Sequence, residues 1–231
     1  MRRSRGELTT ACSVIDLCCG PYLQSETEVI SYDHRFIFIH IYKNAGSSIR
    51  AALLPHIRTP IQRTISRLGQ LFGRQLYNVD PIGIHATAES YREFVGSEEF
   101  PKFFSFAIVR NPWDWQVSLY SFMKKDKEHF QHDFARMGFD EYIDWRCEAD
   151  LHTQKSFIVD RTGRLIVNFV GKYETINRDF DRICKSIGVS AVLPHINASR
   201  HESYREFYTT KTKTKIAQAF SEDIELFGYE F

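Results

Sequence analysis

The sequence contains few of the features that mark secreted, metal-stabilised or membrane-spanning proteins. Five cysteines occur in 231 residues, and no CxxC pair is present, so neither a disulfide framework nor a zinc site is expected. No stretch approaches the roughly 18–20 apolar residues that a transmembrane helix needs. The apolar piece after the basic residues 1–6 is short and carries Asp16, so we expect no signal peptide or anchor. A reduced, cytoplasmic location fits best.

The chain also lacks an excess of either charge. Lys and Arg number 30 against 29 Asp and Glu, which argues against nucleic-acid binding driven by bulk charge. Hydrophobic residues make up 43% and charged residues 26%, an ordinary globular composition that excludes a disordered chain. No internal repeat or low-complexity tract is present. We expect an irregular lead-in over residues 1–30 and a single domain over residues 31–231.

Buried strands followed by helices organise the chain. Residues 36–42 form a near-continuous apolar run typical of a strand buried on both faces, and a helix over 49–54 follows that Pro55 should end. Residues 103–109 form a second such strand, after which Asn111 can cap and Pro112 can begin a helix over 113–124. This alternation predicts an α/β fold with a mostly parallel central sheet flanked by helices.

The second half of the chain continues the pattern. Residues 157–159 and 165–170 flank a turn at 160–164, which predicts a hairpin. A helix over 177–187 should end at Gly188, and apolar residues spaced along 216–227 predict one closing helix.

A turn of small residues follows the first strand and opens the first helix. Such a turn directs several backbone N–H groups at one point, where the helix dipole adds partial positive charge. Lys43 stands at the end of the strand, where its ammonium can reach the same anion. The pattern therefore indicates a phosphate or sulfate site, formed by Lys43, Asn44, Ala45, Gly46, Ser47 and Ser48. By itself the segment is equally compatible with a plain turn and helix cap. It is not the nucleoside-triphosphate P-loop, because GxxxxGK[ST] is absent.

A second motif follows the second strand. Arg110 stands at the carboxyl end of this strand, where open α/β sheets usually bind ligands. Ser118 lies about two helical turns further on, so its hydroxyl can meet the guanidinium at one phosphate. Taken alone, such an arginine can equally cap or pair locally.

Together these segments resemble the carbohydrate-type sulfotransferases that use 3′-phosphoadenosine-5′-phosphosulfate (PAPS), including the shorter bacterial members. The 5′-phosphosulfate loop of that family is similar to residues 39–49, and its 3′-phosphate motif is similar to Arg110 and Ser118 within VRNPWDWQVSLY. The resemblance extends from Val29 to Phe231 and implies a three-layer, P-loop-like fold. One departure is Tyr42, where a proline is common in the family; we expect it to change loop stiffness more than chemistry.

The resemblance also implies roles for individual residues. Lys43 would neutralise the bridging oxygen and the transferring sulfuryl group, residues 44–48 would cradle the 5′-phosphosulfate, and Arg110 with Ser118 would fix the 3′-phosphate. The product would be adenosine 3′,5′-bisphosphate, and no metal is required.

A hydroxyl nucleophile benefits from a general base, for which histidine is best suited. His85 precedes a predicted helix over 88–95. Members of the family that this sequence resembles commonly use a histidine between the two cofactor motifs as the base. The alternatives are that His85 caps this helix or only packs locally, and His40 is a weaker candidate because it belongs to the buried strand. Glu174 receives no role, because a carboxylate at a strand end often only pairs with a nearby arginine.

One basic segment of the sequence bears on the identity of the acceptor. Residues 35–79 contain no acidic side chain, and a basic amphipathic helix is predicted around residues 60–77. It fits a docked surface helix, a site for a polyanionic glycan, or contact with a membrane surface or lipid-linked acceptor. The family resemblance implies sulfuryl transfer to a hydroxyl of a carbohydrate, and the balanced charge argues against a nucleic-acid partner. Two alternatives are a non-catalytic anion- or glycan-binding module and a P-loop-type nucleotide kinase.

Overall fold

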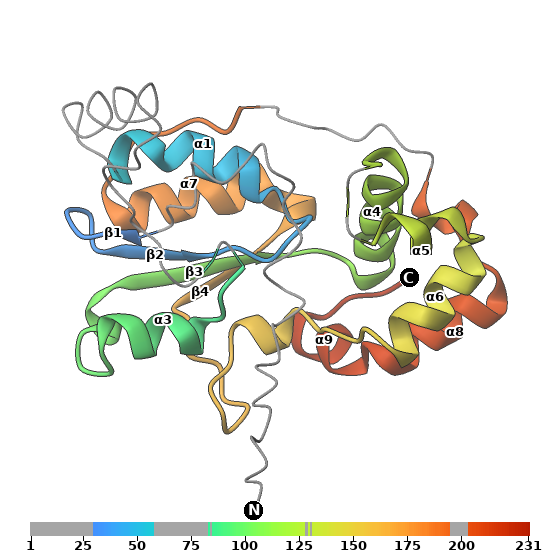
Figure 1. The fold of residues 1–231 in the computed structure, drawn as a ribbon. Coiled ribbons are helices and arrows are strands. Elements are labelled where there is room, and N and C mark those ends of the chain that lie inside the picture. The colour runs from blue at the N-terminus through green and yellow to red at the C-terminus, as the bar shows by residue number, and fades with distance from the viewer. Residues whose placement is uncertain (1–29, 58–82, 84, 128, 130, 195–202) are drawn as a thin grey trace, which may run out of the picture.

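A four-stranded, mostly parallel sheet forms the centre of the computed structural model, which describes residues 30–57, 83, 85–127, 129, 131–194 and 203–231. The strand order is β1-β2-β3-β4. β2, β3 and β4 are parallel, and β1 is antiparallel to β2 (Figure 1). The strands are β1 (Ile30–Ser31), β2 (Phe36–Ile39), β3 (Phe104–Val109) and β4 (Phe169–Lys172). The α/β prediction with a mostly parallel sheet is confirmed.

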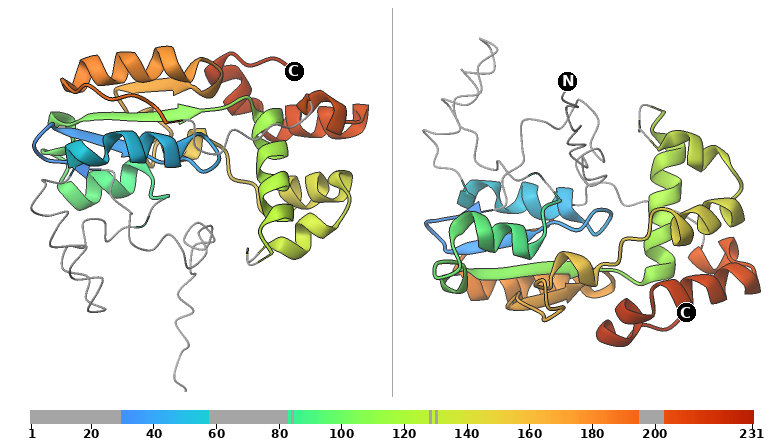
Figure 2. Two further views of the ribbon diagram at one scale, coloured as in Figure 1. Left: turned by 90° about the horizontal axis from the view of Figure 1, so that it is seen from above. Right: turned by 60° about the horizontal axis from the view of Figure 1, so that its bottom comes forward.

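Helices cover both faces of this sheet. α1 (Gly46–Ile57) and α7 (Ile176–Ile187) lie on one face, and α3 (Ala88–Val95) lies on the other (Figure 1). Further helices gather beyond the carboxyl ends of the parallel strands (Figures 1 and 2). They are α4 (Pro112–Lys125), α5 (His132–Arg136), α6 (Phe139–Glu148) and α8 (Thr210–Ala219), followed by α9 (Ser221–Phe227). Short 3₁₀ turns occupy η3 (Phe100–Lys102), η4 (Lys155–Phe157), η5 (Tyr173–Thr175) and η6 (Tyr204–Phe207).

The sheet register brings the loops after three strands to one edge. Phe38 pairs with Phe106 across β2 and β3, and their stacked rings lie 5.1 Å apart between centroids. Val109, the last residue of β3, pairs with Lys172, the last residue of β4. The three parallel strands thus end nearly level. The segments that follow β2, β3 and β4 therefore meet at the carboxyl edge of the sheet, where ligands of open α/β sheets bind.

Two predicted boundaries near the first motif are wrong. The strand expected over 36–42 ends at Ile39. The chain turns there, and the N–H of Ile41 donates to the carbonyl of Ile39, only two residues earlier, at 3.2 Å. The helix expected to end at Pro55 continues to Ile57. A proline this close to a helix end removes one backbone hydrogen bond without ending the helix.

The closing helix and the hairpin also differ from prediction. The single closing helix is two helices that meet at Phe220, whose φ of −109° and ψ of 24° leave the helical region. Its side chain is fully buried and packs edge-to-face on Trp115, 6.1 Å away. The hairpin is reduced to one antiparallel bridge between Val159 and Leu165.

Other local predictions are confirmed. Asn111 caps α4 by accepting the Trp113 N–H at 3.1 Å, and Pro112 is the first helical residue. α7 ends at Gly188, which has a left-handed φ of 67°. The predicted basic helix around 60–77 lies outside the described residues, as do residues 1–29 and most of the 197–205 segment.

Candidate functional site

The turn between β2 and α1 has an unusual backbone. Lys43 and Ala45 have positive φ values of 62° and 61°, and Asn44 between them does not. This alternation makes successive N–H groups converge on one side, as in anion-binding nests. Ala45 precedes α1, and its carbonyl accepts the Ile49 N–H at 3.0 Å. The first turn of α1 carries no acidic residue, so its N–H groups and the helix dipole favour an anion.

Position 46 of this turn has no room for a side chain, because a neighbouring imidazole fills the space beside it. The imidazole of His40 lies so close that a Cβ on residue 46 would be 1.6 Å from its Nε2. His40 itself is buried under the turn and stacks on Phe38 at 5.6 Å. Burial lowers the pKa of His40 well below its usual value, and the charges of His85, Arg50 and Lys43 add to this effect. A neutral imidazole therefore supports the turn from below.

The serines and the asparagine of the turn are placed differently from one another. Ser47 is exposed, whereas Ser48 is buried. The Asn44 side chain is directed into the protein, because its Nδ2 donates to the Ile108 carbonyl (2.9 Å) and to Gln154 Oε1 (2.8 Å). Asn44 thus anchors the turn to the end of β3 through its side chain. Its part in a cradle would come from the backbone.

Lys43 lies at the rim of the site, against an aromatic ring. Its Nζ is 3.8 Å from the ring centroid of Phe122 in α4, a favourable cation–π contact. Phe122 in turn meets His129 edge-on at 5.5 Å. His129 is buried and its Nδ1 accepts the Gln131 N–H at 3.1 Å. Desolvation is the main cause that lowers the pKa of His129, and the Lys43 charge contributes to the same shift. No pattern in the sequence predicts that Phe122 and His129 lie on this side of the site.

Arg110 connects the second motif to the first. The residue is buried, its Nη1 donates to the carbonyl oxygen of Lys43 at 3.2 Å, and its guanidinium lies 4.1 Å from the ring centroid of Tyr173. Its Nε donates to Asp114 Oδ2 at 2.6 Å, so the local pairing considered from the sequence is also present. Ser118 is buried in α4, and among the described residues no hydrogen bond joins it to Arg110. The two motifs nevertheless meet at one edge of the sheet.

His85 is buried beside the first motif. Its Nδ1 lies 2.9 Å from the carbonyl oxygen of His40, and its ring centroid is 4.6 Å from the His40 ring. A carbonyl oxygen only accepts, so Nδ1 carries the proton, and in a neutral imidazole Nε2 keeps the lone pair that a base needs. The alternative that His85 caps α3 is wrong, because Thr87 is the cap and accepts the Ser90 N–H at 3.1 Å.

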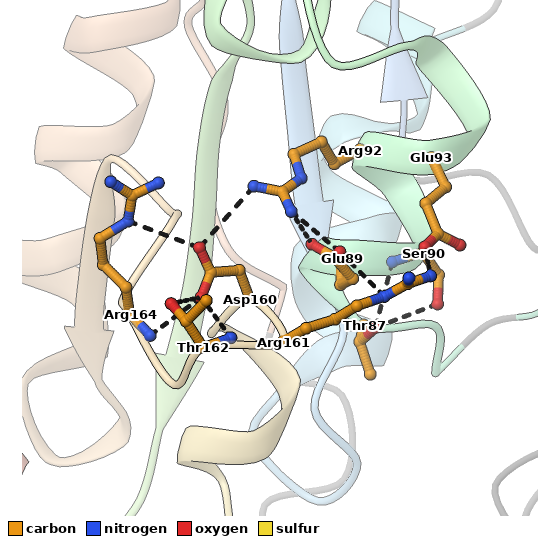
Figure 3. Close-up of polar contacts among 9 residues, drawn as sticks. All are labelled: Thr87, Glu89, Ser90, Arg92, Glu93, Asp160, Arg161, Thr162 and Arg164. Atoms are coloured by element: carbon orange, nitrogen blue, oxygen red, sulfur yellow. Dashed lines mark hydrogen bonds and ion pairs between the residues drawn. The ribbon is translucent and has the colours of Figure 1, made fainter.

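The helix that follows His85 is fixed by a polar cluster between α3 and the turn at 160–164 (Figure 3). Arg92 donates to Glu89 at 2.9 Å within α3, and Arg161 from the turn pairs with Glu89 at 3.5 Å. Asp160 holds the turn itself by accepting the Thr162 N–H at 2.9 Å. Exposed ion pairs such as that of Arg161 contribute little each, but together they link the helix to the turn.

Tyr42 is held from three sides. Its ring stacks on Trp115 at 4.9 Å, and its carbonyl oxygen accepts the indole N–H of Trp115 at 2.8 Å. Its hydroxyl accepts a hydrogen bond from Nη2 of Arg146, which is fully buried in α6. The ring also meets His85 edge-on at 5.8 Å. Packing and a buried hydrogen bond therefore restrain the chain just before Lys43.

The residues that connect the site to the C-terminal part of the chain were not predicted to do so from the sequence. Gln154 is fully buried and hydrogen-bonds both Asn44 and the backbone of Arg110. Glu174 accepts the Asn111 backbone N–H (2.6 Å) and the Tyr229 hydroxyl (3.0 Å), so the expected arginine pairing is not what the structure shows. No periodicity or local motif marks these positions.

Comparison with known protein families matches nearly the whole chain to one of them. A model described as "Sulfotransferase family" matches residues 27–230. The chain belongs to the sulfotransferase family. An uncharacterized protein of Archaeoglobus fulgidus (strain ATCC 49558 / DSM 4304 / JCM 9628 / NBRC 100126 / VC-16) is 30% identical over 118 residues, which are 50% of this chain and 93% of that protein. The matched residues include both motifs and His85 of this sulfotransferase, and the resemblance seen in the sequence is confirmed at the level of the family.

Two kinds of feature are absent from the described part of this sulfotransferase. None of its helices there combines the length and the apolar character needed to cross a membrane. Likewise, the described residues hold no group of three or more His, Cys, Asp or Glu side chains arranged for a metal ion.

Proposed function

We propose that this sulfotransferase transfers a sulfuryl group from PAPS to a hydroxyl of a carbohydrate acceptor. The observation that supports the proposal is the hydrogen bond from Arg110 to the Lys43 carbonyl (3.2 Å), which joins the turn after β2 to the segment after β3. We refer to the turn at 43–48 as the 5′-loop and to the segment from Arg110 to Ser118 as the 3′-motif. A nucleotide with phosphates at both positions needs two anion sites at a fixed separation. The low exposure of Arg110 strengthens any charge-assisted bond that it makes.

The residues of the turn fit the 5′ end of such a nucleotide. The positive φ values of Lys43 and Ala45, the N–H groups and dipole at the start of α1, and the absence of an acidic residue in its first turn all favour an anion. We assign Lys43, Asn44, Ala45, Gly46, Ser47 and Ser48 to this end of the donor. When bound, PAPS supplies the sulfuryl group and a phosphate leaving group.

Arg110 and Ser118 are assigned to the 3′-phosphate in this proposal. The hydrogen bonds of Arg110 to Asp114 and to the Lys43 carbonyl are made by its Nε and its Nη1, and neither of them involves Nη2. A guanidinium with two of its nitrogens fixed is pre-organised, so little conformational entropy remains to be lost when it binds. Asp114 accepts a hydrogen bond from Arg110 Nε and so fixes the orientation of the guanidinium.

Lys43 and His85 are assigned to the chemical step. Lys43 brings positive charge to the oxygen on which negative charge grows, so its contribution is electrostatic. His85 is the proposed general base: with the proton on Nδ1 held by the His40 carbonyl, Nε2 is the atom that takes the proton of the acceptor hydroxyl. A reduced, cytoplasmic location remains part of the proposal and rests on the cysteine content.

The proposal is tested by incubating the protein with [³⁵S]PAPS and a panel of glycans and measuring labelled product. Loss of a general base typically costs about 10²–10⁴-fold, so His85→Ala should cut turnover by that order while changing donor affinity by less than about threefold. His132→Ala is the matched control, because Nδ1 of His132 also contacts a backbone carbonyl, that of Met123 at 2.7 Å. That variant should keep both properties.

Three outcomes would contradict the assignment. If His85→Ala loses donor affinity instead of turnover, His85 is structural. Glycan binding without transfer, unaffected by Lys43→Ala, would favour a binding module. Mg²⁺-dependent ATP turnover without sulfuryl transfer would favour a kinase.

A further inference from the structure

The side chain of Gln154 joins the two motifs that we assign to PAPS. Its Oε1 accepts from Asn44 Nδ2 (2.8 Å) and from the Arg110 backbone N–H (2.8 Å), and its Nε2 donates to the Arg110 carbonyl (2.7 Å). Gln154 is fully buried, with 0% of its surface exposed. Losing any of these bonds would leave a buried polar group unpaired, which is costly.

The bonds to Arg110 continue the sheet by one residue. β3 ends at Val109, the last residue that pairs with β4, so the backbone of Arg110 has no strand partner. The side-chain amide of Gln154 hydrogen-bonds to both the backbone N–H and the backbone carbonyl of Arg110, as a residue of a neighbouring strand would. Asn44 has a second anchor in the Ile108 carbonyl at 2.9 Å. Removing the Gln154 amide should therefore loosen Arg110 more than the 5′-loop.

The backbone of Gln154 is itself fixed from the C-terminal part of the chain. Its N–H and that of Lys155 donate to the two carboxylate oxygens of Asp223, each at 2.8 Å. Asp223 lies in the first turn of α9 and is fully buried. The amide of Gln154 is thus presented by a rigid support.

We propose that Gln154 is a positioning residue that sets Arg110 at a fixed separation from the 5′-loop and thereby gives the site its preference for nucleotides phosphorylated at both the 3′ and the 5′ position. This inference rests on the proposed function, because it assigns the 3′-phosphate to Arg110. The two phosphates of one nucleotide are joined covalently. Both can contribute fully to the binding free energy only if the distance between the two anion sites equals the distance between the phosphates. A 5′-monophosphate needs only one of them.

The test compares the dissociation constants of adenosine 3′,5′-bisphosphate and 5′-AMP by calorimetry, in the wild-type protein and in Gln154→Met. Methionine keeps the volume and removes all three side-chain hydrogen bonds. We expect the ratio of the 5′-AMP constant to the bisphosphate constant to fall by about tenfold or more, while the 5′-AMP constant changes by less than about threefold.

Gln131→Met is the matched control. Gln131 is also buried, and its Nε2 donates a hydrogen bond to Asp150 Oδ2 at 3.4 Å. Neither residue belongs to the two motifs. This variant should leave the ratio at its wild-type value even if it lowers the stability of the fold.

An unchanged ratio in Gln154→Met would overturn the inference. If that variant fails to fold, Gln154→Glu keeps the shape and one acceptor but turns an oxygen toward the Arg110 carbonyl, and it should lower the ratio as well; an unchanged ratio there is equally contradictory. If the wild-type protein shows no preference for the bisphosphate, the 3′-phosphate assignment itself fails. That failure is seen before any substitution is made.

Discussion

The imidazole of His40 occupies the space that a side chain at position 46 would need, with its Nε2 1.6 Å from the place of a Cβ on Gly46. The sequence predicts this glycine to be part of an anion-binding turn. In the structure, the glycine is also what allows a neutral histidine to pack directly beneath the turn. The start of α1 and the end of β2 are therefore interdependent.

Gly46→Ala should destabilise the protein by about 1–3 kcal/mol, because overpacking forces neighbouring groups to shift. In a His40→Ala background the same substitution should cost much less, and denaturant unfolding of the four proteins of this double-mutant cycle measures the difference. Gly138→Ala is the control, since a Cβ there would have no atom nearer than 3.9 Å. Equal costs of Gly46→Ala in both backgrounds would contradict the contact.

His40 should remain neutral at pH values where an exposed histidine is charged. Burial depresses its pKa in the folded protein, so its stabilising contribution is present above the unfolded pKa of about 6.5 and is lost as the pH falls below it. The ring carbon resonances of His40, assigned by comparison with His40→Gln, should not titrate between pH 7.5 and 5.5 in NMR spectra. A titration midpoint near 6.5 would show that the imidazole is solvated.

Asp223 should make the protein less stable as the pH rises from 4 to 6. Burial raises its pKa from 3.8 to about 6 and outweighs the two backbone N–H groups that favour the carboxylate. The unfolded chain loses this proton first, so the contribution is present below about pH 4 and lost by about pH 6, worth on the order of 3 kcal/mol.

Urea unfolding of wild type and Asp223→Asn across this range tests the prediction about Asp223. The variant should show a flatter dependence of the free energy of unfolding on pH. It should also be less stable at pH 4 by about 1–3 kcal/mol, because one of the two backbone N–H groups loses its acceptor. Parallel pH profiles of the two proteins would contradict the raised pKa.

Tyr42→Phe should destabilise the fold by about 1–3 kcal/mol, because the buried guanidinium of Arg146 loses the hydroxyl that accepts its Nη2 hydrogen bond. Chemical denaturation measures the change. Tyr120→Phe serves as the control, since the hydroxyl of Tyr120 donates at 3.0 Å to an uncharged group, the Met137 carbonyl. A cost for Tyr42→Phe no larger than that of the control would mean that the Arg146 contact adds nothing.

The parts of the fold that depend on neighbours in the sequence could be predicted. Apolar runs predicted β2 and β3, and Asn111 with Pro112 predicted the start of α4, because both signals act over a few residues. The break at Phe220 was missed since the same apolar spacing suits one helix or two. Its backbone leaves the helix where the ring is buried against Trp115, a contact between distant segments.

The residues that support the site could not be predicted, for the same physical reason. Gln154 bonds Asn44 across 110 positions of the chain, its N–H bonds Asp223 across 69, and Arg146 bonds Tyr42 across 104. A buried hydrogen bond between segments leaves no periodic pattern in either segment. What the sequence did predict is which residues gather at the carboxyl edge of the sheet, because parallel strands end there.

The most direct test of the central claim is thermal unfolding of the wild-type protein with adenosine 3′,5′-bisphosphate, ADP or AMP. A ligand that binds only the folded state adds about 2.7 kcal/mol of stability at a hundredfold excess over its Kd. A large rise in Tm with the bisphosphate and a small one with ADP and AMP is the predicted result. No rise with the bisphosphate, or an equal rise with ADP, would contradict the assignment of Arg110 and Ser118 to the 3′-phosphate and with it the use of PAPS.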